Sequence, residues 1–268
     1  MREITGQVRH RPWPLPKGPW VMAQRWHELL FAHWVVPASL LRPLIPSRLE
    51  IDTRDGQAWL GVIPFRMSGV RLRGTPPVPG LSAFPELNVR SYVTCDGKPG
   101  VWFFSLDAGN AIAVAVARTW FHLPYFRARM RSAGNGEWIE YRSERTHSDA
   151  PPAKLQVRYR ACGTEQRPEP GTLAHWLTER YCLYAADARE NIYCGEIHHA
   201  PWKLTSAESE FEANTMAEGL GVELPRMEPV LYFAERQEVL VWPPRRLSPA
   251  RRGRTQKARS KKPASANR

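Results

Sequence analysis

The sequence predicts a single domain that is mainly β with a few short helices, built as a barrel or a folded-over antiparallel sheet. Three observations predict this class. Many short segments are rich in aromatic and β-branched residues, Gly- and Pro-containing turn signals separate them, and few stretches have helical character. The chain of 268 residues is long enough to bury a sizeable core, and 43% of it is hydrophobic, as in folded proteins.

The first half of the chain predicts a strand, a short helix, a hairpin and two further strands. Pro37 suits the first turn of the helix, and Asp55-Gly56 suits the turn of the hairpin. A second turn around Gly97 separates the last two strands. We expect the helix at 38–44, and strands at 25–36, 49–52, 57–65 (continuing toward 72), 84–94 and 101–107.

The second half predicts a helix and then mostly short strands. Asn110 is a good N-cap for an alanine-rich helix over 111–120, and Asn135-Gly136 marks a turn. We expect further short helices at 172–180 and 213–218, and strands at 125–131, 138–145, 154–161, 181–186, 191–204, 230–235 and 238–242.

Composition divides the chain into three parts. Residues 1–22 are rich in proline and predict a loose N-terminal arm, and 23–244 predict the single domain. Residues 245–268 carry ten Lys or Arg side chains, and no Asp or Glu follows Glu238. Removing these ten charges from the formal net charge of +12 leaves +2, so the expected domain is nearly neutral. We expect 245–268 to be a disordered basic tail.

The same composition favours a cytoplasmic protein. The four cysteines form no CxxC pair, the N-terminus lacks the apolar segment of a signal peptide, and no apolar run has the length of a membrane span. We therefore expect reduced, mostly buried thiols. The signatures of nucleotide-phosphate loops and of zinc sites do not occur, so we expect no cofactor and no metal.

The most informative segment is the predicted strand that contains Glu86-Leu87-Asn88-Val89-Arg90. Because side chains alternate along a strand, Glu86, Asn88, Arg90 and Tyr92 share one face. That face is either solvated or turned into a barrel lumen that holds a ligand. The very apolar flanking sequence and the apolar neighbouring strand favour the lumen. Buried there, Glu86 and Arg90 would need each other or a ligand carboxylate.

Other polar residues carry weaker signals. Ser105 lacks the Gly-x-Ser-x-Gly setting of a hydrolase nucleophile, and we expect Asp107 to help cap the helix that follows it. His198 and His199 are adjacent on a strand and point to opposite faces, so they cannot share a metal. We take His198 as a candidate ligand contact. His33 is either a satisfied core histidine or a second ligand contact.

Several ordered motifs between Ala23 and Thr205 resemble the YqjF-like family of uncharacterised bacterial proteins. They are Phe31-Ala32-His33-Trp34, Trp59-Leu60-Gly61-Val62-Ile63-Pro64-Phe65, Glu86-Leu87-Asn88-Val89-Arg90, Gly100-Val101-Trp102-Phe103-Phe104-Ser105-Leu106-Asp107, Leu123-Pro124-Tyr125 and Leu177-Thr178-Glu179-Arg180-Tyr181. That family is related to the acetoacetate decarboxylase-like superfamily. The resemblance therefore implies a closed, antiparallel, cone-like β-barrel with a central pocket.

The resemblance also bears on mechanism. Acetoacetate decarboxylases carry their Schiff-base lysine in a segment that follows a helix, and Leu123-Pro124-Tyr125 follows the comparable helix here, which places Tyr125 at the lysine position. The lysines before the tail are Lys17, Lys98, Lys154 and Lys203, none of them beside another lysine. The resemblance thus implies the fold without the decarboxylase mechanism.

Three functional hypotheses follow. The leading one is a protein that binds a small organic carboxylate or carbonyl compound through Arg90, Asn88, His33 and His198. The second is a lysine-independent lyase, isomerase or hydrolase, with Glu86 as acid/base, Arg90 as anion clamp and Tyr125 as proton donor. The third and weakest is nucleic-acid association through the tail, whose charge suits weak binding of polyanions, either a nucleic acid or an anionic membrane. We expect no specific nucleic-acid recognition, because the tail lacks aromatic residues. A homo-oligomer is compatible with all three.

Overall fold

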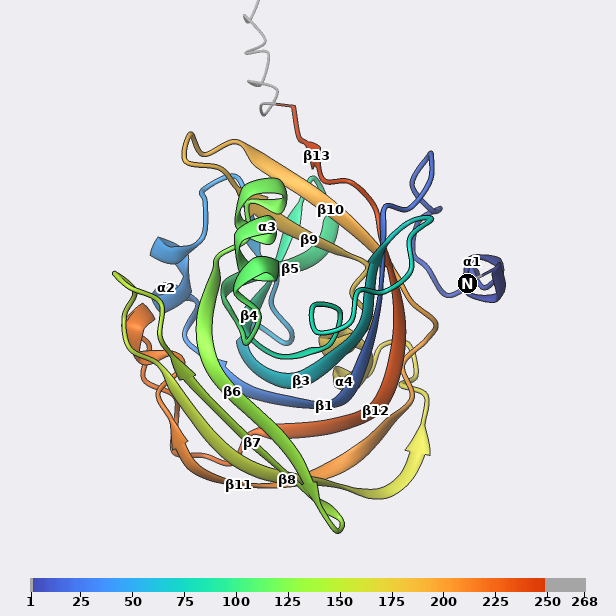
Figure 1. Cartoon of the computed structure of the whole chain (residues 1–268). Helices are drawn as coiled ribbons and strands as arrows, with labels where there is room; N and C mark the ends of the chain where they lie inside the picture. Colours follow the sequence, from blue (N-terminus) through green and yellow to red (C-terminus); the bar gives the residue numbers. More distant parts are fainter. Residues whose placement is uncertain (1, 249–268) are drawn as a thin grey trace, which may run out of the picture.

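The computed structural model describes residues 2–248 and is mainly β, as predicted (Figure 1). Its strands are β1 (Met22–Val36), β2 (Glu50–Ile51), β3 (Ala58–Leu72), β4 (Phe84–Cys95), β5 (Lys98–Ala108), β6 (Tyr125–Asn135), β7 (Trp138–Arg145), β8 (Lys154–Gln166), β9 (Cys182–Ala186), β10 (Ile192–His198), β11 (Leu204–Asn214), β12 (Val230–Val241) and β13 (Arg245–Arg246). The helices are α1 (Arg2–Gly6), α2 (Ala38–Leu41), α3 (Ala111–Phe121) and α4 (Leu173–Thr178), with 3-10 turns η1 (Arg42–Leu44) and η2 (Glu218–Leu220).

The strands form one sheet in the order β13-β10-β9-β5-β6-β7-β8-β11-β12-β1-β3-β4-β2, with additional pairings of β4 with β5 and of β10 with β12. Most pairs are antiparallel, as expected, but β5 runs parallel to both β6 and β9. The expectation of a purely antiparallel sheet was therefore wrong. For β5 and β6 the physical reason is α3, because a helix between two strands is the crossover that parallel pairing requires.

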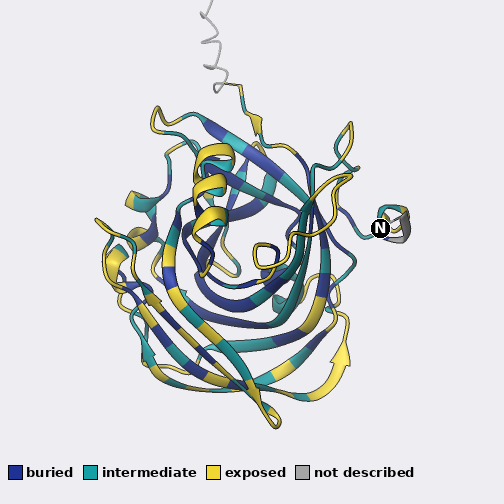
Figure 2. Ribbon diagram, in the orientation of Figure 1, coloured by how far each residue is buried: buried dark blue, intermediate teal, exposed yellow. Residues whose placement is uncertain are grey.

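Both faces of the sheet formed by β1, β3 and β4 are covered. One face contributes Leu30, Val62 and Val89 to a core that also contains Tyr141 of β7 and Tyr159 of β8. The opposite face is concave and contributes to a second core of aromatic and aliphatic residues, which α3 joins through Val114. Figure 1 shows this arrangement, with β1, β3 and β4 curving above β7, β8 and β11, and Figure 2 shows their buried surfaces.

The strand predictions for the first half agree with the structure to within a few residues, apart from the hairpin. β2 pairs with β4 rather than with β3, and only the bridge between Arg54 and Gln57 closes the predicted turn. The predicted helix at 38–44 is divided into α2 and η1, because Pro43 cannot donate the next helical hydrogen bond.

Three predictions for the second half were wrong. The strand predicted at 191–204 is two strands, β10 and β11, separated by a segment that contains Pro201. The helix predicted at 213–218 is the end of β11 and the turn η2, because pairing with β8 extends to Asn214. The two strands predicted at 230–235 and 238–242 are the single strand β12, which stays in register with β1 from Leu231 to Val241.

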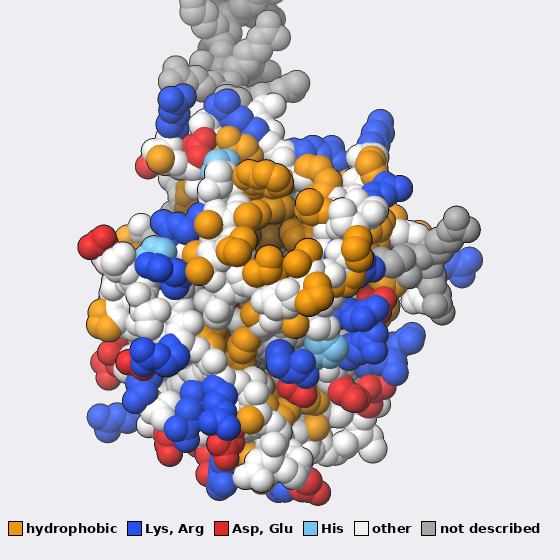
Figure 3. Space-filling view, viewed as in Figure 1, with side chains coloured by type: hydrophobic (Ala, Val, Ile, Leu, Met, Phe, Trp, Pro, Cys, Tyr) orange, Lys and Arg blue, Asp and Glu red, His pale blue; other side chains and the backbone are white. Residues whose placement is uncertain are grey.

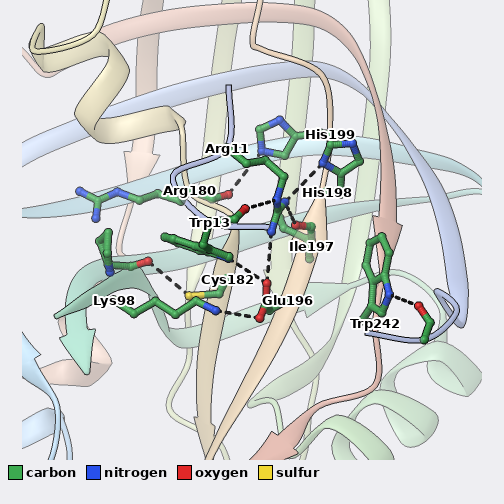
Figure 4. A network of polar contacts seen from close by, with 12 residues as sticks. Arg11, Trp13, Lys98, Arg180, Cys182, Glu196, Ile197, His198, His199 and Trp242 are labelled. Atoms are coloured by element: carbon green, nitrogen blue, oxygen red, sulfur yellow. Dashed lines mark hydrogen bonds and ion pairs between the residues drawn. The ribbon is translucent and has the colours of Figure 1, made fainter. Parts of the chain in front are cut away.

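The ends of the chain also differ from expectation. Arg11 anchors the N-terminal segment, which we expected to be loose, because its fully buried guanidinium donates to the carbonyl of Ile197 (2.7 Å) and pairs with Glu196 (3.2 Å) (Figure 4). Arg245 and Arg246 form β13 against β10, so the expected tail begins after them. The remainder of that tail, from residue 249, lies outside the described residues.

Asp107 does not cap α3, as we had expected. Asn110 does so, accepting from the backbone N–H groups of Ile112 (3.0 Å) and Ala113 (3.1 Å). Asp107 is fully buried and forms a bidentate ion pair with Arg145 of β7, with nitrogen–oxygen distances of 2.7 and 3.1 Å. The pair joins β5 to β7 past β6, the strand that lies between them in the sheet, and both partners are hydrogen-bonded there.

We predict that Asp107→Ala lowers the free energy of unfolding by about 3–5 kcal/mol, because it leaves the Arg145 guanidinium buried without its carboxylate. Urea unfolding followed by circular dichroism measures the loss. The matched control is Glu210→Ala, which removes the exposed carboxylate that pairs with Arg158. Its expected cost is below about 1 kcal/mol, and equal costs for the two variants would contradict the prediction.

Candidate functional site

The candidate site is a row of polar side chains on the concave face of β4. Glu86, Asn88, Arg90 and Tyr92 occupy alternate positions and are at most 9% exposed. Their intervening neighbours, including Leu87, pack into the core on the other side of the sheet. The row therefore faces the interior of the molecule, so a solvated face, one of the two possibilities left open by the sequence, is wrong. We call these four residues the β4 row.

A glycine on the neighbouring strand makes room for the row. Gly61 of β3 is paired with Arg90 on one side and with His33 of β1 on the other. A methyl group at this position would lie 2.9 Å from two atoms of the His33 ring. The glycine therefore allows the imidazole to lie across β3 toward the β4 row.

At the Glu86 end of the row, a carboxyl group is hydrogen-bonded to a phenol. The hydroxyl of Tyr125, the first residue of β6, donates to Glu86 at 2.9 Å. Burial raises the pKa of Glu86 to about 8, an effect that the hydrogen bond from Tyr125 only partly offsets. Burial also raises the pKa of Tyr125 well above its usual value, with a further contribution from Glu86. At neutral pH both groups are therefore protonated, and the pair is uncharged.

The other end of the row, formed by Arg90 and Tyr92, is held by the last turn of α4. The carbonyl of Leu177 accepts from the Tyr92 hydroxyl (2.8 Å) and from the Arg90 guanidinium (3.2 Å). Carbonyls at the end of a helix lack helical partners and carry partial negative charge, which suits a cation. Arg90 also donates to the Tyr92 oxygen (3.3 Å) and lies over the ring of Phe31, 5.5 Å from its centroid.

The hydrogen bonds assign a protonation state to His33. Its Nε2 lies 2.6 Å from the Tyr92 oxygen, whose single proton is donated to Leu177. The ring nitrogen must then be the donor, so the proton is on Nε2 and Nδ1 is a bare acceptor. Burial, with a smaller contribution from the Arg90 charge, lowers the pKa of His33 well below its usual value. His33 is therefore neutral.

Arg90 carries the net charge of this site. The ion pairs among residues 2–248 do not include Arg90, and Glu86, four residues away on the same strand, bonds to Tyr125 instead. Three buried atoms of the site have no hydrogen-bond partner in the described part of the chain: Nδ1 of His33, Oδ1 of Asn88 and Nε of Arg90. The site therefore combines one uncompensated positive charge with unused donor and acceptor capacity.

His198 lies apart from this site, although we expected it to contact the same ligand. Its ring contacts the N-terminal segment, with Nε2 2.9 Å from the carbonyl oxygen of Ile4 and Nδ1 3.3 Å from Arg11 (Figure 4). Its neighbour His199 points the other way, stacking on Tyr181 and lying against Trp202 of the concave core. The alternation of strand side chains makes His199 the inward-facing histidine of the pair.

Two cavities of the described structure lie near this part of the fold, and the four side chains of the β4 row line neither of them. A cavity of about 450 Å³ is lined by Phe84 and Pro85, which directly precede Glu86, and by Leu81, Asn110 and Ile112. Figure 3 shows a hollow surrounded by hydrophobic side chains on the face that carries α3. The larger cavity, about 1000 Å³, is bounded by η1, the middle of β5, the end of α3 and the segment after β9, and the β4 row does not line it.

The lysines of the described chain all lie away from the row. Lys98 pairs with Glu196 (2.7 Å) and Lys203 with Glu165 (2.7 Å). Lys17 and Lys154 are exposed. Within residues 2–248 no group of three or more His, Cys, Asp or Glu side chains is arranged to hold a metal ion, and no helix there is long and apolar enough to cross a membrane.

Sequence analysis did not identify two parts of the site. Tyr92 was placed on the polar face but given no role, although it connects His33, Arg90 and Leu177. The Leu177 carbonyl has no sequence signal at all, because any residue supplies a carbonyl. The period-two pattern of β4 was a usable signal for Tyr92.

We predict that the wild-type protein loses stability as the pH rises from 5 to 8, and that Glu86→Gln abolishes this loss. The pKa of Glu86 is about 8 in the folded protein and 4.5 in an unfolded chain, so the folded state binds the extra proton in this interval. Stability from this group is therefore greatest at low pH and declines as the pH rises. Between pH 5.5 and 7.5 wild type should lose about 2 kcal/mol relative to the variant.

Urea unfolding at several pH values measures this difference. Glu228→Gln, which changes an exposed carboxylate, is the control and should follow the wild-type curve. Parallel curves for wild type and Glu86→Gln would show that Glu86 ionises in the folded protein as it does in water.

The sequence matches a family of known proteins over most of its length. The family DUF2071, described as an uncharacterized conserved protein, matches residues 23–238. The uncharacterized protein YqjF of Bacillus subtilis (strain 168) is 46% identical over 245 residues, which are 91% of this chain and 100% of that protein.

Similar solved structures are enzymes of low sequence identity. Acetoacetate decarboxylase from Legionella pneumophila aligns with a TM-score of 0.60 at 10% identity, covering 91% of this chain and 95% of that one. The enduracididine biosynthesis enzyme MppR, complexed with pyruvate, aligns with a TM-score of 0.60 at 12% identity, covering 88% and 93%. These likenesses show an acetoacetate decarboxylase-like fold. By the extent of the family match and the identity to YqjF, the chain belongs to the uncharacterised DUF2071 family.

Proposed function

We propose that this protein binds a small organic carboxylate or carbonyl compound at the β4 row, without forming a Schiff base. The observation that carries the proposal is Arg90, a buried guanidinium that no ion pair of the described chain includes. Burying an unpaired charge is costly, and an incoming carboxylate offsets that cost through charge-assisted hydrogen bonds.

The state of Glu86 supports the same ligand class. A carboxylate at this position would cancel the Arg90 charge and repel an anion. With its pKa raised to about 8, Glu86 is instead a neutral carboxylic acid at pH 7 and is able to donate a hydrogen bond. The unused oxygen of Asn88, between the two, supports a ligand that also carries a hydroxyl or another donor.

The fold neighbours support a small acid as well. MppR was solved in complex with pyruvate, a compact carboxylate with an adjacent carbonyl. The two proteins share a fold at 12% identity, so this likeness suggests a size and class of ligand rather than a contact set. The pairings of β4 with β5 and of β10 with β12 support the closed barrel that would surround such a ligand.

The positions of the lysines support binding without Schiff-base chemistry. A Schiff-base lysine needs desolvation or a neighbouring cation to be nucleophilic at neutral pH. Lys98 and Lys203 are instead held in ion pairs, and Lys17 and Lys154 are exposed to water. Tyr125, which the resemblance sets at the lysine position, supports the same view, because its hydroxyl donates to Glu86 at 2.9 Å.

A second candidate function is catalysis by the Glu86–Tyr125 pair. A carboxylic acid with a pKa of about 8, bonded to a phenol at 2.9 Å, has the acidity of a general acid or base at neutral pH. Arg90 would then hold the substrate carboxylate of a lyase, isomerase or hydrolase. Incubation of each bound acid with the protein, followed by NMR of the small molecule, decides between the two functions. Consumption that Glu86→Gln abolishes indicates an enzyme, and unchanged ligand indicates a binding protein.

We predict that Arg90→Met weakens carboxylate binding roughly 10–100-fold, which corresponds to the loss of one charged hydrogen-bonding partner. Isothermal titration calorimetry with pyruvate, lactate and benzoate at pH 6.5 measures the effect. The neutral amide of each acid is titrated for comparison. Because the wild-type guanidinium is buried and unpaired, methionine should keep or raise stability, so a loss of binding is not a loss of folding. Equal affinity for the acids and their amides would overturn the proposal.

We predict that the same affinity falls above pH 8, where Glu86 ionises and places a negative charge in the site. Glu86→Gln should bind the acid with an affinity that is constant from pH 6 to pH 9. Titrations across this interval provide the test, and identical pH profiles for the two proteins would exclude Glu86 from the binding site.

A further inference from the structure

The outward face of α3 is apolar although it is exposed. Ile112, Val116 and Trp120 follow one another at intervals of four residues and are 57%, 43% and 63% exposed. Residues four apart share one face of a helix, so the three side chains form a continuous stripe. The opposite face is the one that packs on the protein, through Val114, which is 3% exposed. Figure 2 shows the exposed side of α3.

The loop before β4 extends this stripe. Val78 and Leu81 are 52% and 40% exposed, and the side chain of Asn110, the N-cap of α3, donates to the Leu81 carbonyl at 3.1 Å. Figure 3 shows hydrophobic side chains gathered on this face around the hollow. We call Val78, Leu81, Ile112, Val116 and Trp120 the α3 patch. Contiguous exposed apolar surface of this kind marks a surface that contacts another partner.

The described chain ends close to the C-terminal end of α3, and the sequence that follows is strongly basic. The ring of His122, which caps α3, lies 4.7 Å from the ring of Tyr193. Tyr193 is paired with Arg246 in β13, and the described chain ends two residues later at Ser248. Residues 249–268 then contain eight Lys or Arg side chains and no acidic residue. Arg245 and Arg246, both exposed, precede them.

We propose that this face docks on an anionic phospholipid surface, with the α3 patch inserted among the lipids and the basic segment bound to their headgroups. Stable attachment to a membrane surface needs two signals, and an apolar helix face combined with a polybasic segment supplies both. Trp120, at the C-terminal end of the stripe, has the amphipathic side chain that favours the membrane–water interface.

Charge complementarity decides between this partner and a second copy of the chain. Two copies that meet through the patch would each bring the same basic segment to the contact, and like charges would oppose association. A nucleic acid would suit the basic segment but would not bury the aliphatic side chains that form all of the α3 patch except Trp120, because single-stranded ligands stack on aromatic rings and duplexes present phosphates. An anionic lipid surface matches both features.

Flotation of the full-length protein with vesicles tests the proposal. Wild type should bind vesicles of 70% phosphatidylcholine and 30% phosphatidylglycerol, and should bind pure phosphatidylcholine at least tenfold less. The double variant Val116→Ser/Trp120→Ser, and separately the replacement of Arg251, Arg252, Arg254, Lys261 and Lys262 by Gln, should each weaken binding at least tenfold. Because all of these positions are exposed or lie outside the described fold, circular dichroism should be unchanged.

Met227→Gln is the matched control, since Met227 is 78% exposed but is not part of the α3 patch. It should bind vesicles as wild type does. Three results would overturn the proposal: no binding to anionic vesicles, equal binding by wild type and the serine variant, or a wild-type dimer in light scattering that the serine variant converts to a monomer. The last result would assign the patch to a second copy of the chain.

Discussion

The structure depends on the burial of both faces of β4. One face is mainly apolar and packs against β7 and β8, whereas the other places Glu86, Asn88, Arg90 and Tyr92 in a concave interior. A polar row in that position has to be satisfied by groups from other elements, since water is largely excluded. Tyr125 of β6, His33 of β1 and the end of α4 are brought to the row by this requirement. The polar contacts thereby connect parts of the chain that are distant in sequence.

The two ends of the row differ in how their charge and hydrogen-bonding groups are compensated. At the Glu86 end, protonation removes the charge of the carboxyl group, and a single hydrogen bond from the Tyr125 phenol is sufficient. At the other end, Arg90 keeps its charge, because a guanidinium does not lose its proton in a protein. It contacts only neutral acceptors and two aromatic rings. Burial thus neutralises Glu86 but leaves the guanidinium charged, and the result is a positively charged interior. This asymmetry is the physical basis of the proposed preference for anions.

Much of the fold followed from the sequence. The alternation in β4, the turn at Gly97 and the cap at Asn110 are local signals, and each corresponds to the structure. The errors have a common cause in pairing between distant segments. β11 continues to Asn214 because β8 lies beside it, β2 pairs with β4 rather than with its neighbour in sequence, and Arg11 is anchored by strand β10. None of these partners has a signature within a local window.

The sequence by itself determined that Glu86, Asn88 and Arg90 share one face of a strand, because side-chain direction on a strand has a period of two. It also determined that the lysines before the tail are few and isolated, and that the positive charge gathers at the C-terminus. Only the tertiary structure decided that this face is buried, that Glu86 bonds to Tyr125 rather than to Arg90, and that His198 belongs to the contacts of the N-terminal segment. Burial and partner choice depend on which strands and helices cover a face, and long-range packing alone fixes that.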